Sequence, residues 1–256
     1  PSNSSAASDV YKRQMLYWAI LPLSKGVTYT DFNVGVLFFY AISSLAIYGI
    51  ILAGWASNTK YPFMGSIRST AQMVSYELSI GTVFAVIFLC TGSLNFTKIV
   101  LAQQYIWFCI PLFPLFIIFL IALLAECNRH PFDLPEAEGE LVSGFNTEYS
   151  AMGFALFFIG EYGNIIVMST LISILFCGGW LPLFGLTCIP GIIWLCLKIC
   201  FFISFYVVVR GAYVRFRYDQ LMRIGWKSLL PLCFGWFIFI SGLLLTCNIL
   251  PNILCF

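Results

Sequence analysis

The stretch VGVLFFYAISSLAIYGIILAGW (residues 34–55) decides the fold, because it contains no charged side chain over its whole length. A helix that crosses a membrane needs about 20 predominantly apolar residues. Five further apolar blocks follow, at about 73–91, 106–125, 150–177, 188–209 and 229–250. Their apolar residues come in blocks and do not alternate, which favours helices over a membrane barrel. The sequence therefore predicts an all-α polytopic membrane protein with about six transmembrane helices, preceded by a helical remnant at 15–23.

The composition agrees with this class and excludes several others. The chain is 61% hydrophobic and 9% charged, whereas soluble domains carry roughly 45–50% apolar and about 25% charged residues. This excludes a disordered chain, a nucleic-acid-binding protein and a water-soluble enzyme. The net charge of +2 is too small to indicate an anionic partner. Residues 1–14 are interpreted as a tail or artefact, and 15–256 as a single helical membrane domain.

The connections between the blocks differ in charge, which predicts how the chain is oriented. The polar connections 56–72, 126–149 and 210–228 alternate with the less polar connections 24–33, 92–105 and 178–187, so each set lies on one side. The only cationic residues in the less polar set are Lys25 and Lys98. The positive-inside rule places the polar set on the cytoplasmic or matrix side. Its cations are Lys60, Arg68, Arg129, Arg210, Arg215, Arg217, Arg223 and Lys227.

The acidic residues gather in one connection. Loop 126–149 holds six of the eleven acids of the chain. A solvated acidic loop is the simple interpretation, but apolar pairs such as Leu141-Val142 interrupt it and indicate that it folds back onto the bundle. Carboxylates crowded in this way can hold and pass protons. We therefore favour a functional acidic cluster, made of Glu126, Asp133, Glu136, Glu138, Glu140 and Glu148.

Three charged residues, Glu77, Glu161 and Lys198, lie inside apolar blocks. An ionisable group at the bilayer centre costs at least about 2.5–3.5 kcal/mol, so it serves pairing or transport. One interpretation is a helix–helix clamp, for example between Glu161 and Lys198. The other, which we favour, is a buried proton relay, because both acids enter from the side of the acidic loop.

Other kinds of site find little support in the sequence. The ten cysteines form no C-x-x-C motif and His130 is the only histidine, so neither a zinc site nor disulfides are indicated. The cysteines are expected to be small buried hydrophobes. The segment RGAYVRFRYDQ (residues 210–220) interleaves arginines and aromatic residues after a span, which is typical of a membrane-surface anchor or a dock for an acidic partner. Nucleotide-binding and metalloprotease motifs are absent, as is an internal repeat of the transporter type.

Several long motifs resemble one known family. The segment AECNRHPFDLPEAEGELVSGFNTEY (residues 125–149) is similar to the signature loop of subunit 1 of respiratory complex I, the proton-pumping NADH:ubiquinone oxidoreductase, and of its bacterial counterpart. The resemblance continues through GFALFF (153–158) with Glu161-Tyr162, through GWASN (54–58) with Arg68, Gln72 and 75–77, and through RFRYDQLM (215–222). Together these motifs run from about residue 34 to 231 in the order of the family.

The resemblance implies a membrane subunit that forms the quinone tunnel and the start of an acidic proton path. Ubiquinone would be the substrate, and no redox centre or covalently bound cofactor is expected on this chain. FMN, NADH and iron–sulfur clusters would be held by partner subunits of the complex, in the mitochondrial inner membrane or alternatively a bacterial plasma membrane. By motif, the quinone cavity would be lined by Arg129, Arg210, Phe154 and Phe158. The proton path would use Glu77, Glu126, Glu161 and the loop acids Asp133, Glu136, Glu138, Glu140 and Glu148.

This sequence departs from the family pattern in two respects. Cys127 and His130 stand where the family usually has a threonine and a small residue. The first helix, the amphipathic surface helix and most of the second helix of the family have no counterpart. Two alternatives remain open: the membrane subunit of an energy-converting hydrogenase, which uses no quinone, and a stand-alone secondary transporter.

Overall fold

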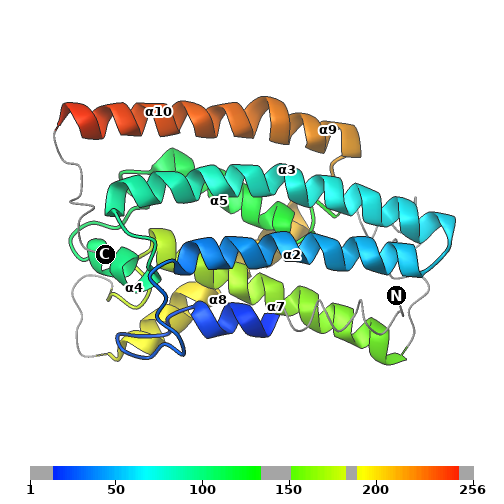
Figure 1. The fold of residues 1–256 in the computed structure, drawn as a ribbon, viewed down its shortest axis with the longest axis horizontal. Helices are drawn as coiled ribbons and strands as arrows, with labels where there is room; N and C mark the ends of the chain where they lie inside the picture. Colours follow the sequence, from blue (N-terminus) through cyan, green and yellow to red (C-terminus); the bar gives the residue numbers. More distant parts are fainter. Residues whose placement is uncertain (1–13, 134–150, 183–188, 248–256) are drawn as a thin grey trace.

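The computed structural model describes residues 14–133, 151–182 and 189–247. Within them the chain is helical and holds no strand, and residues 14–20 form a short helix ahead of the labelled ones. Figure 1 shows the long helices running side by side along the longest axis of the molecule. The labelled helices are α2 (Gly35–Ala56), α3 (Lys60–Thr91), α4 (Phe96–Ala102), α5 (Phe113–Glu126), α7 (Ala151–Phe176), α8 (Gly191–Ala212), α9 (Tyr218–Arg223), the π-helix η3 (Ile224–Leu229) and α10 (Leu230–Thr246).

Five helical segments are long and apolar enough to cross a membrane: α2, α3, α7 from Met152, α8, and the continuous run from Tyr218 to Thr246. The helix α5 is apolar but shorter. This confirms the predicted all-α polytopic membrane protein, and the helix at 14–20 agrees with the predicted remnant.

Small residues bring α2 and α3 together. The buried positions of α2 recur every three or four residues, which forms one continuous face. A Cβ atom at Gly54 would overlap the Ser66 Oγ atom, so only glycine permits this approach. Between membrane helices there is no hydrophobic driving force, and association depends on such close van der Waals contact.

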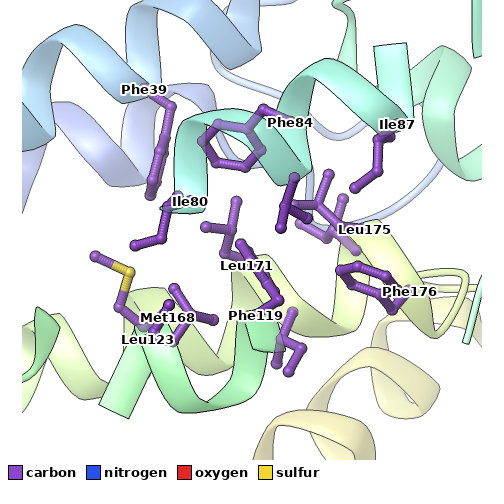
Figure 2. Close-up of a cluster of buried hydrophobic side chains, with 14 of the residues drawn as sticks. Phe39, Ile80, Phe84, Ile87, Phe119, Leu123, Met168, Leu171, Leu175 and Phe176 are labelled. Carbon is purple, nitrogen blue, oxygen red and sulfur yellow. The ribbon is translucent and has the colours of Figure 1, made fainter. Parts of the chain in front are cut away.

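The helix α3 is the centre of the bundle, because it packs against α2, α5 and α10. Figure 2 shows its side chains Ile80, Phe84 and Ile87 facing Phe119 of α5 and Leu175 of α7. The rings of Phe84 and Phe119 are steeply inclined to each other, with centroids 6.0 Å apart, a favourable edge-to-face contact. This core holds the ends of α3, α5 and α7 at fixed positions.

The C-terminal end of α7 is capped by side chains of two other segments. The Lys198 ammonium of α8 donates hydrogen bonds to the carbonyl oxygens of Cys177, Gly179 and Leu181, at 2.7, 2.8 and 2.8 Å. The amide of Gln103 donates to the carbonyls of Ile174 and Leu175 at 3.0 and 3.1 Å. The last turn of a helix leaves carbonyls without helical partners, and Gln103 satisfies two of them. Lys198 satisfies the carbonyls of three residues that follow the helix.

Three predicted boundaries were wrong. Residues 60–72 are not part of a connection but the first turns of α3, since polar side chains such as Gln72 can face the protein interior. The block 106–125 becomes helical only at Phe113, because Pro111 cannot continue a helix through its missing N–H group. The connection 210–228 shrinks to 213–217.

The connection 92–105 contains a helix of its own, α4. The Asn95 side chain accepts a hydrogen bond from the Thr97 N–H group at 2.8 Å, which is an ordinary N-cap.

At the other end of the chain, α9, η3 and α10 form one continuous helix. The Trp226 indole of η3 donates to the Ser75 Oγ atom at 3.0 Å, which ties this helix to α3.

Candidate functional site

The turn that follows α5 is held by one buried glutamine. The Gln72 side chain is fully buried, and its amide nitrogen lies 2.9 Å from the Ala125 carbonyl and 2.8 Å from the Phe132 carbonyl. It also lies 3.2 Å from the Asn128 Oδ1 atom. Asn128 has a left-handed φ of 51°, which asparagine tolerates better than most residues. Gln72 thereby fixes the start of the acidic connection against α3.

Aromatic contacts fasten the same turn to the arginine-rich connection. The Phe132 and Phe216 rings are stacked with centroids 5.8 Å apart, and the Phe216 N–H group donates to the Pro131 carbonyl at 3.1 Å. Tyr76 of α3 lies beside Phe132 and donates from its hydroxyl to the Leu221 carbonyl at 3.2 Å. The described start of the acidic connection, up to Asp133, is therefore joined to the arginine-rich connection.

Arg129, on this turn, pairs with the buried acid of α7. Its Nε atom lies 2.8 Å from the Glu161 Oε1 atom, and both side chains are largely buried. The guanidinium carbon lies 4.7 Å from the centroid of the Tyr162 ring, within the range of a cation–π contact. The alternative interpretation, a clamp between Glu161 and Lys198, is therefore wrong in its partner, because Lys198 binds carbonyls beyond the C-terminal end of α7.

The two arginines predicted to line a cavity both lie at one pocket. This pocket has a volume of about 270 Å³ and lies between the turn after α5, α7 and α8. Its walls are mainly apolar, and its polar side chains are Arg129, Arg210, Tyr162 and Tyr206. The Tyr206 hydroxyl is buried and has no hydrogen-bond partner among the described residues. A buried unpaired hydroxyl beside a cavity is a ready donor for a ligand oxygen.

The two predicted phenylalanines lie next to this pocket but not in its wall. Phe158 lines a second, more open pocket of about 480 Å³ with the helix at 14–20 and Tyr162. The Phe154 ring packs on Phe158 with centroids 4.6 Å apart. Since Tyr162 lines both pockets, the two cavities share a wall.

Glu77 lies in a polar contact between α3 and α2. Its Oε1 atom accepts hydrogen bonds from the Ser44 and Ser43 hydroxyls, at 2.5 and 3.1 Å. The Tyr40 hydroxyl donates to the Glu77 carbonyl at 3.3 Å and lies within electrostatic range of both Glu77 and Glu126. Glu126 itself is 3% exposed at the end of α5. Tyr40 is therefore near two of the predicted path carboxylates and hydrogen-bonded to the backbone of one of them.

The remaining predicted acids lie in or after the turn. Asp133 is buried, and its Oδ2 atom lies 3.3 Å from the Nε2 atom of His130. The other four, Glu136, Glu138, Glu140 and Glu148, lie outside the described residues.

Sequence reasoning missed the side chains that support this site. It noted Gln72 only as part of a motif, and it assigned nothing to Tyr40, Ser43, Ser44 or Tyr206. A polar residue on the buried face of an apolar helix is the signal that points to them, because such a group needs a partner inside the bundle.

The chain is thus a polytopic helical membrane protein in which an arginine-lined pocket adjoins carboxylates buried between helices. Its sequence matches the NADH dehydrogenase family over residues 10–241. It is 60% identical over 240 residues to NADH-ubiquinone oxidoreductase chain 1 of Chondrus crispus, covering 93% of this chain and 74% of the relative. The chain belongs to this family.

Plant and bacterial relatives are similar over the same extent. NADH-ubiquinone oxidoreductase chain 1 of Arabidopsis thaliana is 54% identical over 240 residues, which are 93% of this chain and 74% of the relative. A subunit of the NADH-quinone oxidoreductase of Rhodospirillum centenum is 56% identical over 238 residues, covering 92% of this chain and 71% of the relative.

Proposed function

We propose that this chain is the membrane subunit of a proton-translocating NADH:ubiquinone oxidoreductase that forms the quinone site and the start of its proton path. The observation that carries the proposal is the ion pair between Arg129 and Glu161, because it joins the wall of the pocket to a carboxylate buried in α7. The family membership supports the overall role. FMN, NADH and the iron–sulfur clusters belong to partner subunits in this proposal.

The pocket suits a quinone head group. A quinone has two carbonyl oxygens, which Arg129, Arg210 and the Tyr206 hydroxyl can approach as hydrogen-bond donors. An apolar wall accommodates the ring and the isoprenoid tail. Phe158 in the adjoining pocket, and Phe154 packed on it, extend this apolar surface toward the helix at 14–20.

The ion pair supplies a route by which quinone chemistry reaches the acids. Reduction of a quinone to a quinol takes up two electrons and two protons, so negative charge develops in the pocket before protonation is complete. Arg129 is drawn toward that charge and its contact with Glu161 weakens, since interactions between charges are strong where water is excluded. Glu161, with its cationic partner farther away, then binds a proton more readily.

The path continues from Glu161 through Glu126 and Glu77, with Tyr40, Ser43 and Ser44 as hydroxyl links near Glu77. Asp133 and the loop acids Glu136, Glu138, Glu140 and Glu148 feed it from the connection. The cationic end of the bundle faces the matrix in a mitochondrial inner membrane, in agreement with the positive-inside rule.

The test is Glu161→Gln in the assembled complex. This change keeps the shape and removes the exchangeable charge, so NADH:quinone turnover and coupled proton transfer are expected to fall several-fold at normal assembly. Asp219→Asn is the matched control, because Asp219 pairs with Arg217 on the exposed surface. Normal proton pumping by the assembled Glu161→Gln enzyme would refute the path.

A further inference from the structure

Two cysteines that are far apart in the sequence lie close together in space, at the end of the bundle where α7 ends. Cys109 lies in the connection between α4 and α5, and Cys177 directly follows α7. The Cys109 N–H group donates to the Phe176 carbonyl at 3.0 Å, so the backbone of one cysteine adjoins the residue before the other. The two thiols lie close enough for each to shift the pKa of the other. Both side chains are half-buried free thiols.

The position of Cys177 is fixed by its surroundings. Its carbonyl accepts the 2.7 Å hydrogen bond from Lys198, and its N–H group donates to the Ser173 carbonyl at 3.2 Å. The next N–H group, that of Gly178, donates to the Gln103 Oε1 atom at 2.9 Å. Gly178 and Gly179 both have left-handed φ angles, 70° and 49°, which turn the chain sharply after the thiol.

The two thiols differ in acidity in a way that suits stepwise oxidation. The hydrogen bond from Cys177 stabilises the thiolate of Cys109 and lowers the pKa of Cys109 to about 7. The same hydrogen bond, together with burial, raises the pKa of the Cys177 thiol. The thiolate is the nucleophile in cysteine chemistry, so Cys109 is the thiol that reacts first.

We propose that Cys109 and Cys177 form an oxidisable dithiol, which a hydroperoxide converts into an intramolecular disulfide. The Cys109 thiolate attacks a peroxide oxygen, the O–O bond breaks and hydroxide leaves, which gives a sulfenic acid at Cys109. The Cys177 sulfur then attacks the Cys109 sulfur, an S–S bond forms and water leaves. In total, two thiols and one hydrogen peroxide give one disulfide and two waters.

The consequence is a covalent link between α7 and the connection before α5. Hydrogen bonds from Lys198 and Gln103 already hold this junction in the reduced protein. The link bridges two segments that already adjoin, because the Cys109 N–H group is hydrogen-bonded to the carbonyl of Phe176, the residue before Cys177. The dithiol lies at the C-terminal end of α7, well past the residues from Tyr162 to Ile166 that line the proposed quinone site, so its oxidation does not depend on the function proposed for that site.

The test uses the purified intact complex in mild detergent, treated with increasing hydrogen peroxide and then with N-ethylmaleimide before digestion and mass spectrometry. The expected product is a Cys109–Cys177 cross-linked peptide that rises with peroxide and disappears with dithiothreitol. Its rate of formation is expected to rise with pH through about 7, because the thiolate of Cys109 is lost below that pH. Cys90, another half-buried thiol, is the internal control. It is expected to stay reduced during the peroxide treatment and therefore to be alkylated by N-ethylmaleimide.

A variant separates the two steps. In Cys177→Ser the reaction is expected to stop at the sulfenic acid of Cys109, which dimedone traps. The proposal is overturned if Cys109 and Cys177 of the wild-type complex remain alkylated while Cys90 is oxidised. It is also overturned if dimedone labels Cys109 equally in the wild type and in Cys177→Ser, because Cys177 would then not resolve the sulfenic acid.

Discussion

Replacing Gln72 with methionine is expected to loosen the turn that carries Arg129 while leaving the packing of α3 intact. Methionine has a similar length and volume, and changes of this kind in a packed interior usually cost less than about 1.5 kcal/mol through packing alone. The main loss is therefore that of the hydrogen bonds donated by the Gln72 amide to the carbonyls of Ala125 and Phe132 and to the Asn128 side chain.

The size of the effect follows from these three contacts. Side-chain hydrogen bonds between membrane helices average about 0.6 kcal/mol and reach about 1.7 kcal/mol. The two contacts at 2.9 and 2.8 Å are near the ideal length, and the one to Asn128 at 3.2 Å is at the long limit. The total is roughly 1–4 kcal/mol, which is enough to release the turn without preventing assembly.

The assay compares quinone-dependent NADH oxidation with NADH oxidation by a soluble acceptor that bypasses the quinone site. In Gln72→Met the quinone-dependent rate per assembled complex is expected to fall several-fold, because Arg129 is no longer held against Glu161, while the bypass rate stays unchanged. Gln104→Met is the matched control, since Gln104 is exposed near the end of α4. Wild-type quinone turnover in assembled Gln72→Met would refute the reasoning.

Three further outcomes are expected. Gly54→Leu should abolish assembly, because a Cβ atom there would overlap the side chain of Ser66. The control Gly211→Leu should assemble, since a Cβ atom at that position meets nothing within 4 Å. Immunoblots of native gels distinguish the two outcomes. Lys198→Met should lower the thermal stability of the complex by the equivalent of about 2–4 kcal/mol, because it leaves three carbonyls of one turn without their donor; an unchanged melting curve would contradict the capping role. Tyr206→Phe should leave thermal stability unchanged and raise the KM for quinone by up to about tenfold, the value of one hydrogen bond; an unchanged KM would show that this hydroxyl does not contact the quinone.

The helical class was predictable because hydropathy is a property of composition, but helix ends were not. Hydropathy falls where a helix leaves the apolar environment, and the helix itself continues as long as its backbone hydrogen bonds do. For this reason α3 begins at Lys60, well before its apolar block. Proline has the opposite effect at Pro111, where an apolar segment is not helical.

The site was predictable in its residue types and less so in its pairings. Both arginines assigned to the cavity do line one pocket, because the motif fixes them at the ends of neighbouring helices. The partner of Glu161 was not predictable from a list of buried charges, since both Arg129 and Lys198 had the right sign. Three-dimensional position decides: Lys198 lies at the C-terminal end of α7, whereas Glu161 lies near the middle of that helix.

The carbonyl cage around Lys198 has a consequence for how the membrane receives this part of the chain. An ammonium group has three N–H donors, and the three carbonyls at the end of α7 occupy all of them in place of a hydration shell. These three carbonyls surround the ammonium group only when α7 and α8 are already antiparallel neighbours. A lone α8 would carry the bare cation into lipid at a cost of about 2.5–3.5 kcal/mol or more. The two helices are therefore expected to enter the bilayer as one hairpin, with the lysine passing directly from water to its internal ligands.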